Sequence, residues 1–220
     1  MHGPPLQSAG FVDRQRRAAG RVPDFSPALP KASLPYMTRL EDRLRTILRH
    51  APGRMEALAA VAKVKLPQGA IGAGFVRSAV WDALTGRQAT PVDDIDVLYL
   101  DPGDVSRDTE IRIEHTLDGI LPGLPWSVRN QARMHTRNGD LPYHSMEDAL
   151  RHWLETPTAV AVRLLARDDF EIVAPFGLDD LFAMRISPTP RGRERAAEYR
   201  KRIETRGWRA KWPEAEIELP

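Results

Sequence analysis

The chain has 220 residues, 42% of them hydrophobic and 28% charged, which is close to the average of globular proteins and excludes wholesale disorder, collagen and low-complexity structure. It contains no cysteine, so disulfides, thiolate zinc sites and cysteine nucleophiles are excluded, and its net charge of +2 predicts no partner by itself. No run of about 18 apolar residues is present, and the start lacks a basic stretch followed by an apolar one. We therefore expect a cytoplasmic protein of one or two domains with no membrane partner.

The beginning of the chain is rich in proline, with six in the first 35 residues and a basic cluster at Arg14, Arg16 and Arg17. Proline at this density prevents regular structure, which predicts a proline-rich flexible arm over 1–34. A basic arm that touches nucleic acid is the alternative to a merely solvated tail. Apolar residues at helical spacing then predict an N-terminal helical segment of two helices over 35–68.

From 69 to 184 the patterns alternate between strand and helix, which predicts an α+β (α/β-like) domain. In chain order, the expected elements are a strand at 70–71, helix at 75–84, strand at 94–100, helix at 106–121, strand at 126–134, helix at 145–154, buried strand or helix at 158–165, strand at 170–173 and short helix at 178–184. A very charged helix over 192–206 follows, within a basic C-terminal helix and tail over 185–220.

Aspartates recur at alternate positions in the segment Asp93-Asp94-Ile95-Asp96-Val97. Successive side chains of a strand point to opposite faces, so Asp94 and Asp96 share one face and their apolar neighbours share the other. Two carboxylates this close repel each other and raise each other's pKa unless a cation neutralises them. The pattern indicates a site for one or two hard cations, and a solvated strand end rich in aspartate is the alternative.

A glycine turn, Gly72-Ala73-Gly74, lies about twenty residues upstream, between a short apolar run and a helix. Glycine lets the backbone approach a phosphate closely, and a helix N-terminus favours an anion. A tight turn with nothing bound is the alternative for such a turn alone. Together with the aspartate pair, the turn predicts a place for a triphosphate beside a place for its metal ions.

This combination resembles the signature of the DNA polymerase β-like nucleotidyltransferase superfamily, carried here by 71–77 (Ile-Gly-Ala-Gly-Phe-Val-Arg) and 94–97 (Asp-Ile-Asp-Val). The first segment is most similar to the Gly-Gly-x-Val-Arg-Asp motif of CCA-adding enzymes and poly(A) polymerases, with Ala73 in place of the first glycine and Ser78 in place of the final aspartate. Over about 36–213 the chain also resembles a bacterial family of predicted nucleotidyltransferases, in the segments 76–77, 80–82, 94–97, 126–135 and 174–181.

The resemblance implies a polymerase β-type core over 69–184, with a small mixed sheet flanked by helices. It implies a metal-dependent nucleotidyltransferase that moves an NMP group from an NTP to a hydroxyl of RNA, protein or a small molecule, with Mg²⁺ or Mn²⁺ as cofactor and pyrophosphate as product. Asp94 and Asp96 match the first two metal-binding carboxylates of the superfamily. Gly72 and Gly74 match its phosphate turn, and Arg77 is in place to contact phosphate, although a surface or ion-paired arginine is an equal reading.

The superfamily usually adds a third carboxylate from a neighbouring strand. Glu171 is our first candidate for this catalytic and metal-binding position, because it opposes the face of its apolar neighbours on a short strand. Asn130 stands where a carboxylate could be expected, but an amide is a poorer ligand. Asp179 and Asp180 open a helix, where the helix dipole alone favours acidic residues.

Charge is unevenly distributed, with nine acidic and two basic residues over 93–118 and ten basic and three acidic residues over 185–211. An acidic region would concentrate cations, and a basic region could hold phosphates or an RNA acceptor. Trp208 and Trp212 lie among the basic residues near the C-terminus. Base stacking is one reading of these tryptophans, and hydrophobic anchoring of a solvated helix is the other.

Two other function classes remain open from the sequence alone. One is a catalytically weak module that binds nucleotide or RNA on the same fold, if no third carboxylate exists. The other is a glycosyltransferase that holds a sugar nucleotide through its Asp-x-Asp, but that fold normally needs a longer α/β half before the motif than the 25 or so residues present here.

Overall fold

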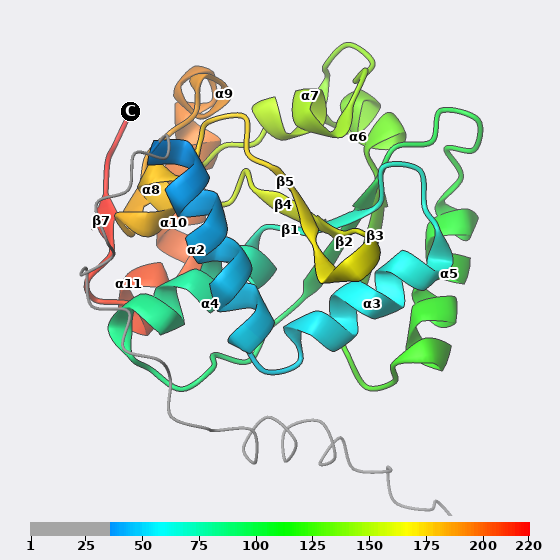
Figure 1. Cartoon of the computed structure of the whole chain (residues 1–220). Coiled ribbons are helices and arrows are strands. Elements are labelled where there is room, and N and C mark those ends of the chain that lie inside the picture. The colour runs from blue at the N-terminus through cyan, green and yellow to red at the C-terminus, as the bar shows by residue number, and fades with distance from the viewer. Residues whose placement is uncertain (1–35) are drawn as a thin grey trace, which may run out of the picture.

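The computed structural model describes residues 36–220, so the predicted arm over 1–34 lies outside the described residues (Figure 1). The helices are α2 (Tyr36–His50), α3 (Arg54–Val64), α4 (Gly74–Thr85), α5 (Arg107–Ile120), α6 (Gln131–Asn138), α7 (Met146–Arg151), the 3-10 turn η1 (Ala166–Asp168), α8 (Asp179–Phe182), α9 (Pro190–Glu194), α10 (Ala196–Arg206) and α11 (Trp208–Lys211). The strands are β1 (Ala70–Gly72), β2 (Ile95–Tyr99), β3 (Trp126–Asn130), β4 (Ala161–Leu164), β5 (Phe170–Val173), β6 (Arg185–Ile186) and β7 (Glu216–Ile217).

Five strands form a mixed sheet in the order β3-β2-β1-β4-β5. β2 and β3 are parallel and are joined through α5, as a parallel pair requires a crossover. β1 runs antiparallel to both of its neighbours, and β5 closes the far edge against β4. The strands β6 and β7 form a separate parallel pair that ties the end of the chain back to the body of the protein.

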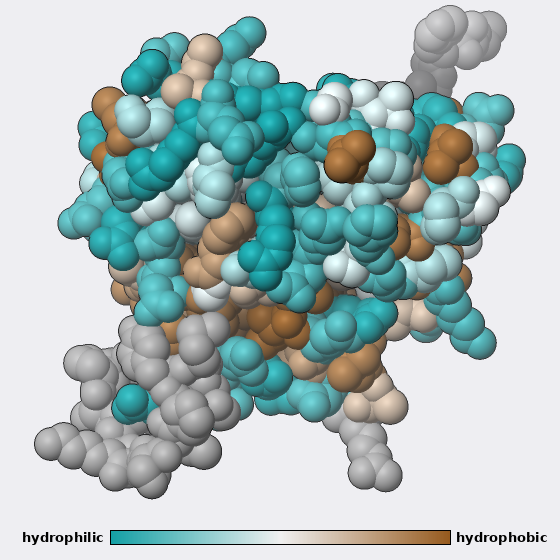
Figure 2. All heavy atoms as spheres, turned by 90° about the horizontal axis from the view of Figure 1, so that it is seen from above, coloured by the Kyte–Doolittle hydropathy of each residue, from teal (hydrophilic) through white to brown (hydrophobic). Residues whose placement is uncertain are grey.

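Alternation along the strands divides the core between the two faces of the sheet. Ile95, Val97 and Tyr99 pack into the main cluster with the buried side chains of α2, α3, α4 and α5. Leu98 points to the opposite face and packs in a smaller cluster with Met146 and Leu150 of the α7 region. The face of the molecule seen from above in Figure 2 is mostly hydrophilic.

This architecture confirms the predicted α+β (α/β-like) class with a small mixed sheet flanked by helices. The open assignment of 158–165 resolves as a strand, β4. The strand expected over 126–134 is wrong in its second half, because the chain turns into α6 after Asn130. The Asn130 side chain accepts a hydrogen bond from the Ala132 amide at 3.0 Å, which caps the new helix.

The C-terminal part is also more divided than expected. The predicted helix over 192–206 begins earlier, where Thr189 caps α9 and Pro190 occupies its first turn, and it is interrupted at Arg195 before α10. The short strands β6 and β7 and the helix α11 were not predicted, because two to four residues carry too little periodicity to be recognised. Among residues 36–220, none of the helices is both long and apolar enough to cross a membrane.

Candidate active site

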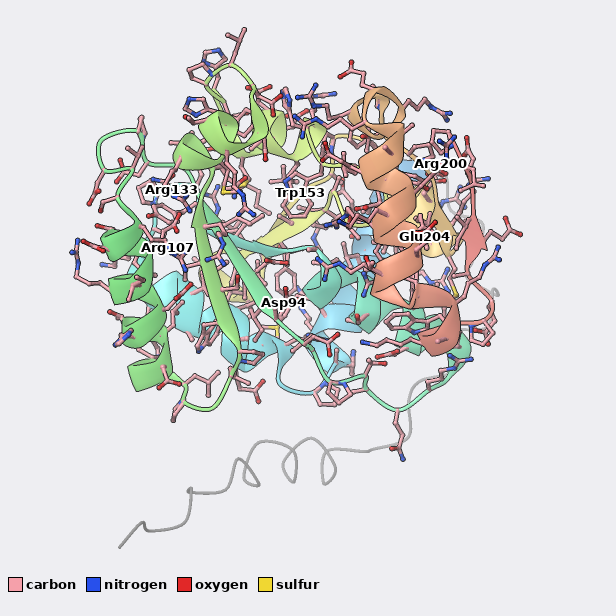
Figure 3. The ribbon with its side chains drawn as sticks, turned by 180° about the vertical axis from the view of Figure 1, so that it is seen from behind. Asp94, Arg107, Arg133, Trp153, Arg200 and Glu204 are labelled. Carbon is pink, nitrogen blue, oxygen red and sulfur yellow. The ribbon has the colours of Figure 1, made fainter. Side chains whose placement is uncertain are left out.

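Asp94 and Asp96 lie on the wall of a cavity. Residues of β2, α4, α6, α9 and α10 line this cavity. Asp94 directly precedes β2 and Asp96 is its second residue, while Ile95 and Val97 between and after them are 1% and 0% exposed in the core. The cavity has a volume of about 670 Å³. In Figure 3, Asp94 lies between the strands on one side and α10 on the other, with Trp153 farther along the same cavity. The alternation predicted from the sequence is therefore present, and both carboxylates face solvent-accessible space.

Asp96 is held in an environment that disfavours its charge. Burial, and after it the neighbouring charge of Asp94, raises the pKa of the Asp96 carboxyl from 3.8 to about 6. The positive charges of Arg206, Arg129 and Arg202 act in the opposite direction but are outweighed. A cation at the aspartate pair would relieve this unfavourable charge.

The glycine turn meets the aspartate pair at one edge of the sheet. β1 is antiparallel to β2, with Ile71 opposite Val97, so the end of β1 lies beside the start of β2. The turn that follows β1 begins α4, and Ala73 and Gly74 line the same cavity as the aspartates. The sequence argument placed a phosphate turn beside two carboxylates, and the fold brings these residues together.

The two glycines of the turn have different surroundings. A Cβ atom on Gly72 would lie 3.0 Å from Leu98 Cδ1 and 3.1 Å from the Val160 carbonyl oxygen, so Gly72 allows β1 to pack closely between its neighbours. A Cβ atom on Gly74 would meet only Arg77 Nη2, at an ordinary 3.6 Å. Gly74 is therefore not required by the packing of the protein itself, and the space beside it is open to a ligand.

Arg77 lies in the first turn of α4 and lines the cavity, although it is only 8% exposed. Its Nη2 donates to Ser78 Oγ at 3.2 Å, and its Nε has no hydrogen-bond partner within residues 36–220. Its guanidinium carbon lies 5.0 Å from the ring centroid of Trp212, 5.4 Å from that of Trp81 and 5.5 Å from that of Trp208. Arg77 is thus a buried cation that contacts aromatic rings instead of a carboxylate.

Burial also changes the acidity of this arginine. The pKa of Arg77 is lowered from 12.5 to about 10, first by desolvation and then by the like charge of Arg206. It remains protonated at neutral pH. A surface or ion-paired role, the alternative considered from the sequence, does not fit a guanidinium this buried and without an ion pair in the described residues.

The helix α10 supplies the opposite wall of the cavity. Arg195, Glu198, Arg202 and Arg206 line the cavity at spacings of three and four residues, which places them on one side of the helix. Arg202 Nη2 donates to Glu155 Oε2 at 3.1 Å and Arg202 Nε donates to Oε1. This pair fixes α10 to the segment before β4.

Sequence reasoning missed the cavity residues outside the two motifs. Across the part of the chain that the structure describes, seven arginines and one lysine line the cavity, against six acidic residues. Those without a sequence prediction include Arg129 and Glu155, whereas Arg202 and Arg206 belong to the basic region over 185–211 that could hold phosphates. The basic composition of 185–211 and the three-and-four spacing of the α10 residues are the signals for a functional face, but the same pattern is typical of a solvated charged helix.

The structure does not bring Glu171 to the aspartate pair. Glu171 lies on β5 and accepts a hydrogen bond from Arg163 of β4. β1 and β4 both separate β5 from β2, so at about 4.8 Å per strand the two backbones lie about 14 Å apart. A metal ion needs its ligands within about 2.6 Å, so Glu171 cannot share an ion with Asp94 and Asp96.

The other candidates for a third carboxylate are also placed elsewhere. Asn130 is 0% exposed and is used structurally, since its Nδ2 donates to the carbonyl oxygens of Asp101 at 2.7 Å and Asp104 at 2.9 Å. Asp180 accepts from Arg185 at 2.7 Å, and neither it nor Asp179 lines the cavity. Glu155 does line it but is held by Arg202. In residues 36–220, no group of three acidic or histidine side chains is arranged to hold a metal ion.

The tryptophans near the C-terminus serve as hydrophobic anchors, which was one of the two readings of the sequence. Trp208 is 3% exposed and Trp212 1% exposed. The ring of Trp212 packs edge-on against Trp81 at 5.2 Å between centroids. Neither ring is free to stack on a base without rearrangement.

The comparisons with known proteins identify the family and the fold. A nucleotidyltransferase family model matches residues 59–217, well over half of the chain. A structure described as revealing a CCA-adding enzyme head domain, determined by NMR, has a TM-score of 0.73 at 29% identity, and the match covers 81% of this chain and 96% of that one. No curated protein sequence matches the chain.

Larger enzymes match less closely. A tRNA-processing enzyme complex has 19% identity and a TM-score of 0.48 over 74% of this chain, and the Thermotoga maritima CCA-adding enzyme complexed with tRNA has 17% and 0.46 over 82%. The match spans only 43% and 39% of their lengths. The family match and the head-domain fold confirm the resemblance found in the sequence, and the chain belongs to this nucleotidyltransferase family, with the fold of the polymerase β-like nucleotidyltransferases.

Proposed function

We propose that this nucleotidyltransferase transfers an NMP group from an NTP to a hydroxyl acceptor with the help of Mg²⁺ or Mn²⁺ held by Asp94 and Asp96. The observation that carries the proposal is that both carboxylates share a cavity with the turn at Gly74 and with the buried, unpaired Arg77. Carboxylates, a close backbone approach and an arginine are the groups that a metal-bound triphosphate requires.

Two carboxylates are enough for this kind of metal site. Mg²⁺ is usually held by one or two carboxylates together with substrate phosphates and water, and dedicated all-protein cages are not needed. The raised pKa of Asp96 beside Asp94 supports the fit, because a bound cation would favour the charged form of both. Glu171 is therefore not part of the proposed site.

Each protein group has a separate task in the proposed reaction. The backbone at Gly74 and the positive end of α4 would bind the triphosphate, with Gly72 setting the path of the turn. Arg77 would neutralise phosphate charge from a low-dielectric position, where its interaction is strongest. When bound, the divalent cation would favour ionisation of the acceptor hydroxyl and stabilise the charge that develops on the transferred phosphoryl group.

RNA is the first acceptor to test, followed by protein and small-molecule hydroxyls. The solved head domain that is 29% identical to this chain is described as that of a CCA-adding enzyme. The excess of basic over acidic side chains around the cavity also favours a phosphate-bearing acceptor.

The test is pyrophosphate release from each of the four labelled NTPs with Mg²⁺ or Mn²⁺, in the presence of RNA, protein or aminoglycoside acceptors. Asp94→Asn and Asp96→Asn should each lower turnover at least about 100-fold, since metal stabilisation of the transition state is worth several kcal/mol. Asp108→Asn, an exposed aspartate at the start of α5, is the matched control and should turn over like the wild type.

The variant Glu171→Gln distinguishes the proposed site, which lacks Glu171, from the sequence-based hypothesis that Glu171 is the third metal ligand. It removes a half-exposed ion pair with Arg163, so activity should stay within twofold of the wild type. Turnover that survives both Asp94→Asn and Asp96→Asn would contradict the proposed site. Stabilisation by NTP without any turnover would favour a nucleotide-binding module instead.

A further inference from the structure

Trp208, two residues after the end of α10, packs against Arg77. Gly207 ends α10 in a left-handed conformation, with φ 62°, and Trp208 begins α11 immediately after it. Trp208 is buried, and its ring lies 5.5 Å from the Arg77 guanidinium. Arg206, the last residue of α10, is exposed and lines the same cavity as Arg77.

Arg206 differs from the other basic residues on this wall. Arg202 is neutralised by Glu155, and Lys211 Nζ lies 2.7 Å from Asp93 Oδ2. In the structure of residues 36–220, neither Arg206 nor Arg77 forms an ion pair with a carboxylate. Arg137 of α6 also lines the cavity without an ion pair, so three guanidinium groups of the described lining have no counter-charge. Of these, Arg77 and Arg206 are the two whose charges act on each other.

These two groups act on each other through space. The charge of Arg206 lowers the pKa of Arg77, which means that the two cations repel. Arg206 lines the same cavity as Asp94 and Asp96. A ligand with several negative charges, placed between Arg77, Arg206 and a metal ion on the aspartates, would remove the repulsion and leave each charge partnered.

We infer that Arg206 is a phosphate-binding residue, supplied by the C-terminal helices to the β- and γ-phosphates of the NTP from the side opposite Arg77 and the glycine turn. This inference rests on the proposed function. The helices α10 and α11 then do more than dock against the core, because nucleotide binding joins them to α4 through the triphosphate.

Calorimetric titration of the full chain with an NTP, the matching NMP and inorganic tripolyphosphate, all with Mg²⁺, tests this assignment. Arg206→Gln should weaken binding of the NTP and of tripolyphosphate about 10- to 100-fold, the range of one charge-assisted hydrogen-bond pair, and should change NMP binding less than twofold. Arg206→Lys should recover part of the loss, since the charge remains and the fork is lost.

Arg200→Gln is the matched control, because Figure 3 shows Arg200 on the side of α10 that faces away from Asp94. It makes the same charge change on the same helix outside the cavity lining, and it should bind NTP like the wild type. Melting temperatures of all variants should agree within about 2 °C, which separates binding from folding.

Equal NTP affinity in Arg206→Gln and the wild type would overturn the inference and leave the proposed function standing. A parallel loss of NTP and NMP binding with a lower melting temperature would also overturn it, since Arg206 would then be structural. A wild type that binds no NTP would overturn the proposed function. In that case, tripolyphosphate binding that depends on Arg206 would support an anion site at Arg206 without nucleotidyl transfer. If tripolyphosphate did not bind either, both the proposed function and the inference about Arg206 would be refuted.

Discussion

Trp212, the residue that ends α11, donates its indole N–H to Oδ1 of the buried Asp82 of α4, at 2.9 Å. The same carboxylate accepts from the Thr90 amide at 2.6 Å and from the Thr90 hydroxyl at 2.8 Å. One aspartate therefore connects α4, the loop before β2 and the end of the chain. Because α4 carries Gly74 and Arg77, this contact holds the C-terminal helices in place against the cavity.

Trp212→Phe should lower the free energy of unfolding by about 2 kcal/mol or more, because a buried hydrogen bond to a charged group is lost together with part of a packed ring. Urea denaturation measures the change. A double-mutant cycle with Asp82→Ala should show coupling of at least about 0.5 kcal/mol between the two positions. Additive effects of the two substitutions would mean that the hydrogen bond contributes nothing to stability.

Local periodicity was sufficient to predict most of the elements and the face on which each aspartate lies. Ile95 and Val97 are buried and Asp94 and Asp96 face the cavity, as alternation requires. The same rule placed Glu171 on the face opposite its apolar neighbours but could not give its distance from the pair. That distance depends on the strand order, with β1 and β4 inserted between β2 and β5, and strand order is a property of the whole fold.

The residues of the far wall could not be predicted for a related reason. The spacing of Arg202 and Arg206 on α10 identifies a helix face, but a charged face points to solvent in most helices. It faces a cavity here because Trp208 and Trp212 anchor the following turn in the core. The sequence left open whether those tryptophans were anchors or stacking platforms, so the position of α10 stayed undetermined.

The glycine turn contains one residue in a conformation that suits glycine better. Ala73 has φ 53° and ψ −127°, in a region that side chains disfavour by about 1–3 kcal/mol. Ala73→Gly should therefore raise the free energy of unfolding by about 1 kcal/mol, after allowing for the greater freedom of glycine in the unfolded chain. The urea midpoint measures this gain.

Ala79→Gly is the matched comparison, because Ala79 lies in the interior of α4, the helix that Ala73 precedes. This substitution should destabilise the protein by about 1 kcal/mol or more. If Ala73→Gly destabilised the protein to a similar extent, the backbone at Ala73 would not be strained.

The two glycines of the turn should respond differently to alanine. Gly72→Ala places a methyl group 3.0 Å from Leu98 and 3.1 Å from the Val160 carbonyl, and this crowding should cost about 1–3 kcal/mol of stability. Gly74→Ala meets only ordinary contact, so its melting temperature should match that of the wild type, while a methyl group beside the triphosphate should weaken NTP binding about tenfold or more. Thermal melting and calorimetric titration of both variants measure these effects. Normal NTP binding by Gly74→Ala would refute the assignment of Gly74 to the triphosphate site.

The half-buried Asp96 predicts a pH dependence of stability with a definite sign. Because the pKa of Asp96 is about 6 in the folded protein and 3.8 ordinarily, the folded state binds a proton more tightly than the unfolded state does. The contribution of Asp96 to stability is therefore fully present below about pH 4 and is lost as the pH rises through 6. The shift corresponds to about 3 kcal/mol at most.

The variant Asp96→Asn should not lose stability as the pH rises through 6, because it lacks the titrating carboxyl. Without metal, the variant should match the wild type in urea denaturation near pH 4 and exceed its free energy of unfolding by about 1–3 kcal/mol at pH 7.5. Mg²⁺ with NTP should stabilise the wild type at pH 7.5 but not at pH 4.5, where the carboxyl is protonated, and should not stabilise the variant at either pH. A variant less stable than the wild type at pH 7.5 would mean that the Asp96 carboxylate is already compensated by Arg129, Arg202 and Arg206, so that no cation is needed there.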